Sequence, residues 1–333
     1  MTVACVSGAS GMLGGRLVER LHQEGLEIRA LLRPTSQDRW LRRLPIDIVR
    51  AESDDGEALK RAVIGADLLF HTAGYIDIGS TFDVDEPDEK YRQANVDFTR
   101  LLLEASLEAG VARFIHISSG SVYAPDYPFP LTEDAPLAPF TAYGRSKLEA
   151  ETLVLAYQER GLPATIIRPT LIYGPRDRHL LPTGIKLARV PILPLVDGGV
   201  HYLDLVYVDD VVDLAWRASQ SEAAERKIYN AGCGKPLRLH EYFEILGGFE
   251  GFEPRIVAAS PHLSMRLRKL AGFYLSLTAP GAEVLLSASG IRLMSQDVHF
   301  DMTRAENDLG PLLHTSFREG LAATLAADRF API

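Results

Sequence analysis

The chain has 333 residues, of which 47% are hydrophobic and 24% are charged. These are values of an ordinary globular protein and exclude a disordered, collagen-like or low-complexity chain. There are 35 Lys and Arg residues against 44 Asp and Glu residues, a net charge of −9. Because an acidic surface repels phosphate backbones, we do not expect nucleic acid as a partner. Two cysteines are too few for a disulfide framework, and no apolar segment approaches the roughly 20 residues of a membrane span. We therefore expect a cytoplasmic protein without stable membrane insertion.

The first half of the chain alternates between strand and helix patterns. Thr2–Ser7 is a short apolar run typical of a buried strand, and a glycine-rich turn leads from it into a helical pattern at Arg16–Glu24. Further strands are predicted at Glu27–Leu32, Leu68–Thr72, Phe114–Ser118 and Ala164–Arg168, and further helices at Glu57–Ile64, Tyr91–Ala109 and Ala142–Gln158. This alternation predicts an α/β fold with a doubly wound parallel sheet.

The rhythm breaks after Tyr173, where Pro and Gly punctuate the sequence. A strand at Leu205–Val208, a helix at Asp210–Ser219 and a strand at Lys227–Asn230 indicate that the chain returns to the sheet before a helix at Leu239–Gly247. We expect a dinucleotide-binding domain at residues 1–172, with returning segments at about 203–232. A smaller, mostly helical α/β lobe that binds substrate is expected at residues 173–333, interleaved with the first.

A glycine-rich turn follows the first predicted strand. Gly8, Gly11 and Gly14 stand where missing side chains let the backbone approach a pyrophosphate at the positive end of a helix. An ordinary tight turn remains an alternative interpretation of these three residues.

A Tyr and a Lys lie four residues apart in a predicted helix. This spacing places Tyr143 and Lys147 on one face, where the ammonium group can lower the pKa of the phenol. Ser118 and Ser119 follow an apolar strand, at the sheet edge where open α/β folds bind ligands. The glycine turn, the serines and the Tyr/Lys pair occur together in chain order, which favours a function over separate accidents.

The chain resembles the extended short-chain dehydrogenase/reductase family, within the NAD-dependent epimerase/dehydratase superfamily, over about Val3–Leu214. The resemblance rests on GASGMLG from Gly8, on Asn95-Val96, on SSGSVY from Ser118, on YGRSK from Tyr143 and on RPTLIYGP from Arg168. In style the chain is closest to dihydroflavonol reductases and 3-beta-hydroxysteroid dehydrogenases. The resemblance implies a Rossmann domain, a Tyr143 acid/base, a Lys147 that holds the nicotinamide ribose, and a Ser119 that orients the substrate oxygen.

The same resemblance implies the residues that contact the cofactor and the substrate. The cofactor set is Gly8, Ser10, Gly11, Met12, Leu13, Gly14, Arg33, Glu52, Ser53, Thr72, Ala73, Gly74, Asn95, Ser118, Tyr143, Lys147, Pro169 and Thr170. The substrate set is Tyr75, Ser119, Ser121 and Leu171. His71 and His116 are expected in the core, and no metal ligands are predicted.

The end of the second predicted strand decides between the two dinucleotides. No carboxylate ends that strand and Arg33 follows it, which favours the 2′-phosphate of NADP, although NAD remains possible. An Arg33 side chain that only faces solvent is the alternative.

Several sequence features favour a hydrophobic small-molecule substrate. Leu203 precedes Asp204 where sugar-nucleotide enzymes of the family carry an Arg for the diphosphate, and Arg176 and Arg178 are the nearby cations that could replace it. We therefore expect a ketone reductase or alcohol dehydrogenase. A nucleotide-sugar epimerase or dehydratase with tightly bound NAD is the first alternative, and a non-catalytic dinucleotide sensor is the second.

Three further features remain open at this point. Residues 75–88 are long enough for a lid or a plain loop. The segments Pro261–Tyr274 and Leu275–Leu286 are predicted as helices over the cleft, and the basic amphipathic stretch Met265–Leu270 fits either such a helix or a membrane-surface contact. The helices at Tyr91–Ala109 and Ala142–Gln158 could form a homodimer contact, or only pack on the sheet.

Overall fold

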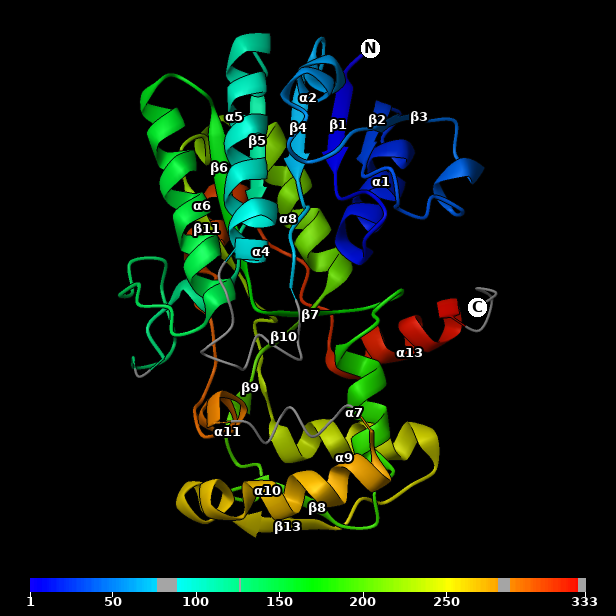
Figure 1. Ribbon diagram of the computed structural model, residues 1–333, viewed down its shortest axis with the longest axis vertical. Coiled ribbons are helices and arrows are strands. Elements are labelled where there is room, and N and C mark those ends of the chain that lie inside the picture. Colours follow the sequence, from blue (N-terminus) through cyan, green and yellow to red (C-terminus); the bar gives the residue numbers. More distant parts are fainter. Residues whose placement is uncertain (77–88, 126, 281–287, 329–333) are drawn as a thin grey trace.

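Seven parallel strands form the central sheet, in the order β11-β6-β5-β4-β1-β2-β3 (Figure 1). The structure is a computed structural model that describes residues 1–76, 89–125, 127–280 and 288–328. The strands are β1 (Val3–Ser7), β2 (Glu27–Leu32), β3 (Asp47–Arg50), β4 (Leu68–His71), β5 (Arg113–Ile117), β6 (Ala164–Pro169) and β11 (Ile228–Ala231). The strand order reverses between β1 and β4, which is where open α/β sheets bind ligands.

Helices cover both faces of this sheet, which confirms the predicted doubly wound arrangement. One face carries α1 (Met12–Gln23) and α8 (Val208–Gln220), which pack against each other. The other face carries α2 (Gly56–Val63), α5 (Phe98–Ala109) and α6 (Ala142–Glu159). The central strands are apolar because both of their faces are buried. His71 and His116 are fully buried, as predicted.

The structure differs from the sequence prediction at three places in this region. Helix α1 begins at Met12 and not at Arg16, since Gly14 and Gly15 lie inside its first turns. Strand β3 was not predicted, because an edge strand of four half-exposed residues carries little hydrophobic pattern. The predicted helix at 91–109 comprises α4 (Glu89–Tyr91), a π-helical turn at Arg92–Asp97 and α5.

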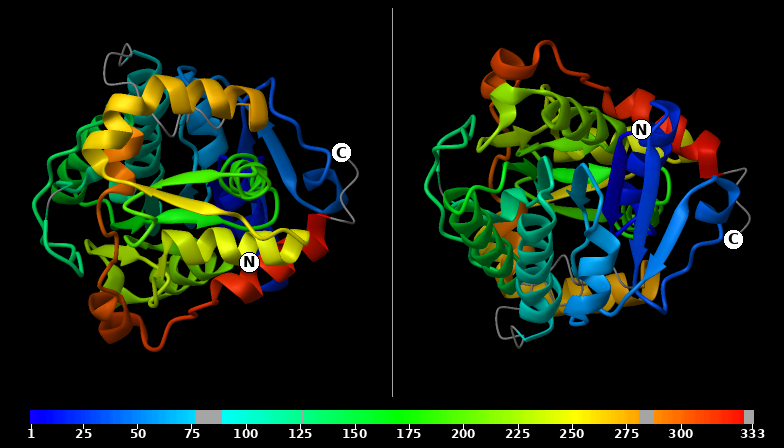
Figure 2. Two further views of the ribbon diagram at one scale, coloured as in Figure 1. Left: turned by 90° about the horizontal axis from the view of Figure 1, so that it is seen from below. Right: turned by 90° about the horizontal axis from the view of Figure 1, so that it is seen from above.

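The remaining elements gather at the opposite end of the molecule (Figure 1). We call the sheet with its covering helices the sheet lobe, and the following group the cap lobe. The cap lobe contains α7 (Leu180–Ala188), β8 (Leu193–Val196), α9 (Leu239–Glu250), β13 (Ile256–Ala259) and α10 (Pro261–Thr278). Strands β8 and β13 form a parallel pair, and α7 packs on α9. The end-on views of Figure 2 show the two ends, with α10 and β13 nearest the viewer on the left and the sheet lobe on the right.

Short elements connect the two lobes. They are β7 (Leu171–Tyr173), paired with β10 (Leu205–Tyr207), and β9 (Tyr202–Leu203), paired with β12 (Leu237–Arg238). Helix α11 (Ala288–Met294) contacts α10, whereas α12 (Thr303–Leu309) returns to β11, and α13 (Phe317–Asp328) contacts β10. The described residues also form 3-10 turns at Leu41–Arg43, Gly120–Val122 and Glu222–Ala224.

The chain returns to the sheet lobe as the sequence indicated, because β11 pairs with β6 and α8 packs on α1. The domain boundary at residue 172 stays a prediction. Most of the proposed lid at 75–88, and residues 281–286 of the predicted tail helix, lie outside the described residues. Among the helices that are described, none combines the length and hydropathy that crossing a bilayer requires.

Candidate active site

The glycine turn between β1 and α1 packs tightly against the end of β4. Gly8 has a φ of +75°, and a Cβ on it would lie 2.6 Å from the backbone nitrogen of Ala73. A Cβ on Gly14 would lie 2.4 Å from the carbonyl oxygen of Gly8 and 2.5 Å from Thr72 Oγ1. Thr72 Oγ1 in turn donates a hydrogen bond of 2.7 Å to the Ser7 carbonyl. The structure thus brings together two predicted cofactor segments, the glycine turn and residues 72–74.

The N-terminus of α1 fits the pyrophosphate that the sequence predicted there. Gly11 is the N-cap and is exposed, no side chain caps the helix, and the first turn contains no acidic residue. The first N–H groups of a helix lack partners within the helix and attract an anion. Because glycines keep this approach open, the residues present suit a dinucleotide.

A short loop after β2 forms the expected adenosine end of this site. Arg33 is exposed and its carbonyl accepts a hydrogen bond of 3.1 Å from Arg50 Nη1, which also bonds the carbonyls of Pro34 and Ser36. Arg50 Nη2 pairs with Asp38 at 2.6 Å. Glu52 and Ser53 follow β3 next to this loop. The strand β3, which the sequence analysis missed, therefore supplies the arginine that shapes the loop.

Ser119 and Tyr143 meet at the carboxyl end of β5. Thr141 caps helix α6 by accepting a hydrogen bond from the Gly144 N–H at 3.0 Å, which places Tyr143 in the first turn. The Ser119 hydroxyl donates a hydrogen bond of 3.2 Å to the Ser121 hydroxyl. Burial raises the pKa of Tyr143, and the nearby Ser119 hydroxyl opposes that rise. The phenol is therefore protonated at neutral pH.

Lys147 is buried one turn further along α6. Its Nζ donates a hydrogen bond of 2.7 Å to the Ile117 carbonyl, at the end of β5. Burial lowers the pKa of Lys147 to about 8, and the Glu151 carboxylate opposes this shift. The spacing of Tyr143 and Lys147 predicts that the ammonium group lowers the pKa of the phenol. The direction found for Tyr143 is upward because burial dominates and the opposing contact comes from Ser119.

Two predicted cofactor residues are engaged with the protein itself. The Asn95 amide accepts a hydrogen bond of 2.7 Å from the Tyr75 N–H and donates one of 2.9 Å to Ser146 Oγ. Ser146 Oγ donates to the Tyr143 carbonyl at 2.8 Å. Asn95 lies in the π-helical turn, a feature that often marks functional sites. It thus connects the segment after β4 with the first turn of α6. The second of the two residues is Ser118, whose Oγ donates a hydrogen bond of 2.5 Å to Glu151 Oε1.

A buried ion pair that the sequence analysis did not predict lies behind the site. Glu151 on α6 and Arg168 on β6 are each no more than 2% exposed and pair at 2.7 Å and 3.0 Å. Arg168 Nη1 also donates to the Tyr123 hydroxyl at 3.0 Å and to the Glu133 carbonyl at 3.1 Å. The spacing of Glu151, four residues after Lys147, was the available signal.

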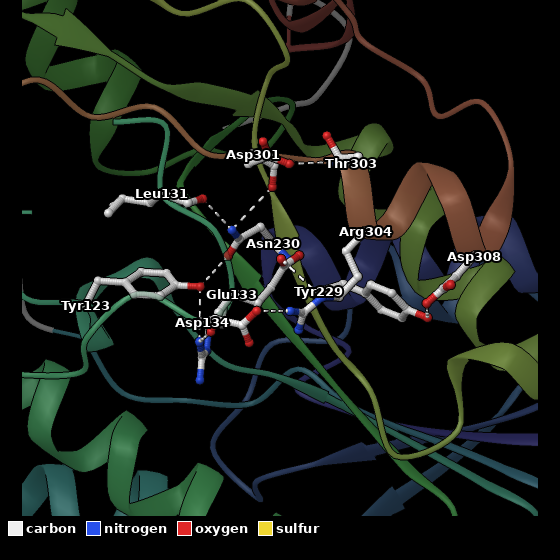
Figure 3. Close-up of polar contacts among 11 residues, drawn as sticks. Tyr123, Leu131, Glu133, Asp134, Tyr229, Asn230, Asp301, Thr303, Arg304 and Asp308 are labelled. Atoms are coloured by element: carbon white, nitrogen blue, oxygen red, sulfur yellow. Dashed lines mark hydrogen bonds and ion pairs between the residues drawn. The ribbon is translucent and has the colours of Figure 1, made fainter. Parts of the chain in front are cut away.

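This ion pair continues into a polar network that reaches helix α12 (Figure 3). The Tyr123 hydroxyl donates a hydrogen bond of 2.6 Å to the side chain of Asn230 on β11. The Asn230 N–H donates to Glu133 at 2.9 Å, and Arg304 of α12 lies 3.5 Å from the same carboxylate. Arg304 also pairs with Asp134 at 2.6 Å. The network therefore fixes β11 and α12 against the strand that carries Arg168.

The predicted substrate side of the site is bordered by residues from later in the chain. Thr170 Oγ1 lies 3.2 Å from the fully buried Asp204, which also accepts hydrogen bonds from the Phe300 and Cys233 N–H groups. The ring of Phe300 occupies the space beside Gly120, where a Cβ would lie 2.5 Å from it. Phe300 also lines a cavity of about 880 Å³ that does not include the catalytic candidates. Phe300 thus separates that cavity from the turn after Ser119.

Other predicted substrate contacts are accessible. Leu171 on β7 is 41% exposed, and Ser121 is exposed beside Ser119. Tyr75 lies with its ring 5.2 Å from that of Tyr91, which is 6.3 Å from the ring of Tyr143. The described residues contain no group of three or more His, Cys, Asp or Glu side chains placed to hold a metal ion.

Comparisons with known proteins agree with this fold. The chain is 26% identical over 332 residues to a 4-hydroxy-2-methyl-3-oxo-4-farnesyl-3,4-dihydroquinoline-1-oxide ketoreductase of Stigmatella aurantiaca, covering 96% of this chain and 94% of that protein. It is 27% identical to a 2-alkyl-3-oxoalkanoate reductase of Stenotrophomonas maltophilia, covering 95% of this chain and 96% of that protein. The fold is similar to that of the UDP-glucuronic acid 4-epimerase from Bacillus cereus in complex with UDP-glucuronic acid and NAD, with a TM-score of 0.78, 21% identity and coverage of 98% and 99%.

The family itself follows from a match over most of the chain. Residues 4–232, which include the glycine turn, Ser119, Tyr143 and Lys147, match the NAD dependent epimerase/dehydratase family. The expected resemblance is thereby confirmed, and the chain belongs to the NAD-dependent epimerase/dehydratase family.

Proposed function

We propose that the protein is an NADP-dependent reductase of a ketone on a hydrophobic small molecule, with NAD as the second choice of cofactor. The observation that carries this proposal is the contact between Ser119 and a protonated Tyr143 at the carboxyl end of β5. The bound dinucleotide supplies a hydride to the carbonyl carbon. Tyr143 donates its phenolic proton to the carbonyl oxygen, which Ser119 orients with its hydroxyl.

The buried Lys147 is proposed to bind the cofactor. Its ammonium group, with a pKa of about 8, bonds the Ile117 carbonyl on the same strand end that leads to Ser119. We assign it to the ribose of the nicotinamide half, as the family resemblance implies. Arg33 is assigned to the 2′-phosphate, because it is exposed on a loop that Arg50 holds in shape.

The charges near the site favour this substrate class over a nucleotide sugar. Leu203 stands where a cation would hold a diphosphate. Of the two candidate replacements, Arg176 packs against α1, where it pairs with Glu19 and stacks on Trp40 at 4.1 Å. The other, Arg178, is exposed. Both relatives described above are named as reductases of oxo compounds, one of them carrying a farnesyl group.

The test measures the reduction of a panel of hydrophobic ketones, which is monitored through the loss of NADPH absorbance. Tyr143→Phe is expected to lower kcat by about 100- to 10,000-fold, the usual contribution of a general acid, with little change in dinucleotide affinity. Tyr157→Phe is the matched control, since that tyrosine lies at the other end of α6 and bonds Glu104. Its kcat is expected to equal that of the unchanged protein.

Two results would contradict the proposal. Undiminished turnover by the Tyr143→Phe variant would remove Tyr143 from the reaction. Acid denaturation that releases one NAD per protein chain would favour the epimerase. An epimerase returns the hydride to its substrate and keeps its NAD bound, whereas a reductase exchanges its cofactor in every cycle.

A further inference from the structure

Helix α10 of the cap lobe leaves a stripe of large apolar side chains in solvent. Leu263, Leu267, Leu270, Phe273 and Leu277 are between 44% and 69% exposed. Their spacing of three and four residues places them along one side of the helix. The opposite side is used for packing, since Leu275 is buried. Single exposed leucines are ordinary, but a continuous row of five is not explained by the fold of this chain.

The charge of α10 is opposite to that of the whole chain. The segment Pro261–Thr278 contains His262, Arg266, Arg268 and Lys269 and no acidic residue, whereas the net charge of the protein is −9. Arg266 and Lys269 are exposed beside the apolar row. A helix with exposed leucines and neighbouring cations has the composition of an amphipathic helix that lies in a lipid headgroup layer. The acidic remainder of the protein would turn away from such a surface.

The position of α10 leaves this row accessible. Together with β13 it forms the end of the molecule opposite the sheet (Figures 1 and 2). Val257 on β13 is 42% exposed and adds an apolar side chain at the same end. No part of the sheet lobe lies in front of this end in the left view of Figure 2 or below it in Figure 1.

We propose that α10 docks the protein on an anionic phospholipid membrane. The apolar row enters the boundary between headgroups and acyl chains, and Arg266 and Lys269 contact lipid phosphates. A second copy of the chain fits this face less well. Pairing two α10 helices about a two-fold axis would place Arg266 and Lys269 of both copies at one interface, and the helix offers no carboxylate to neutralise them. The docking is independent of the proposed activity, although it would bring the enzyme to apolar ketones dissolved in a bilayer.

The test is sedimentation of the whole protein with vesicles. Vesicles of phosphatidylcholine with phosphatidylglycerol are expected to bind the protein about tenfold or more tightly than vesicles of phosphatidylcholine alone, and salt is expected to weaken the binding. The double variant Leu270→Ser/Phe273→Ser is expected to lose binding by about tenfold or more, because these are among the most exposed side chains of the row. Arg266→Glu/Lys269→Glu is expected to abolish the preference for anionic vesicles.

Ile64→Ser is the matched control, since Ile64 is 62% exposed but lies in the sheet lobe. It is expected to bind vesicles like the unchanged protein. Light scattering without lipid gives the oligomeric state of each variant. The proposal is overturned if neither vesicle binds the protein. It is also overturned if Leu270→Ser/Phe273→Ser changes a dimer into a monomer without affecting vesicle binding, which would assign the row to a second copy.

Discussion

The sheet lobe buries charged side chains at its centre, whereas the cap lobe exposes apolar side chains at its surface. In the sheet lobe, Glu151 and Arg168 are nearly inaccessible, and Arg168 is also bonded by Tyr123 and Glu133 from the segment between β5 and α6. In the cap lobe, Leu270 and Phe273 on α10 are among the most exposed apolar residues. Substitutions at such a surface change the free energy of unfolding little, whereas those in a buried polar network change it greatly. The proposed catalytic residues thus lie in the lobe with the buried polar network, and substitutions on the cap-lobe surface are expected to leave them undisturbed.

The largest expected effect tests the buried charge directly. Glu151→Gln leaves the Arg168 guanidinium buried without a counter-ion and is expected to lower the free energy of unfolding by about 3–5 kcal/mol. The cap-lobe control is Glu250→Gln, which removes the partner of the half-exposed Arg189 and is expected to cost less than about 1 kcal/mol. Urea unfolding of the two variants measures both values. Equal losses would mean that the two lobes do not differ in this respect.

The second effect concerns the buried ammonium group of Lys147. Its pKa is lowered to about 8 in the folded protein, against an ordinary value of 10.5. Between these values the unfolded chain binds a proton that the folded chain lacks, so stability rises with pH through this window. Below about pH 8 the folded protein bears a cost on the order of 3 kcal/mol for holding the charge. Lys147→Met is therefore expected to be more stable at pH 7 and inactive, with an advantage that shrinks from pH 8 to 10.5.

The cap-lobe control for this prediction is Lys269→Met, since Lys269 is exposed on α10. Its unfolding free energy is expected to stay within about 0.5 kcal/mol at every pH. Thermal unfolding at a series of pH values measures both variants. A Lys147→Met variant that is less stable than the unchanged protein at pH 7 would show that the hydrogen bond to Ile117 outweighs the cost of burial.

The smallest effect compares two helical glycines. A Cβ on Gly14 would collide with the Gly8 carbonyl, so Gly14→Ala is expected to cost about 1–3 kcal/mol and to weaken dinucleotide binding. A Cβ on Gly272 of α10 meets nothing within 4 Å, and Gly272→Ala is expected to stabilise the protein by roughly 0.5–1 kcal/mol. Unfolding curves and dinucleotide titration check the pair. Loss of dinucleotide binding in both variants would indicate a global change in place of a local collision.

The sequence predicted the elements of the sheet lobe well, because their signals are local. Apolar runs and the turn at Gly8 depend on a few neighbouring residues, and the predicted strands end within one or two residues of β1, β2, β4, β5 and β6. The return of the chain through β11 was also predicted, from an alternation that resumes after a proline-rich stretch.

The missed features depend on contacts between distant parts of the chain. Glu151 and Arg168 are charged residues that a pattern assigns to the surface, and only the crossing of α6 over β6 makes them a buried pair. The pair of β8 with β13 joins segments on opposite sides of α8, β11 and α9 in the sequence; both strands have only four residues, and β13 is partly exposed. Four-residue strands of this kind carry little periodic signal, so the sequence predicted helices near α9 and α10 of the cap lobe but not this strand pair.

The placement of β11 also affects how the protein is made on the ribosome. Strand β6 ends at Pro169, but its outer neighbour begins only at Ile228. At roughly 5–20 residues per second, several seconds of translation separate the two. During that interval the nascent chain carries an apolar strand with an unpaired edge, and Tyr123 and Glu133, which contact Arg168, still lack their own partners Asn230 and Arg304. Molecular chaperones that shield unpaired strand edges would act on this protein while it is still being translated.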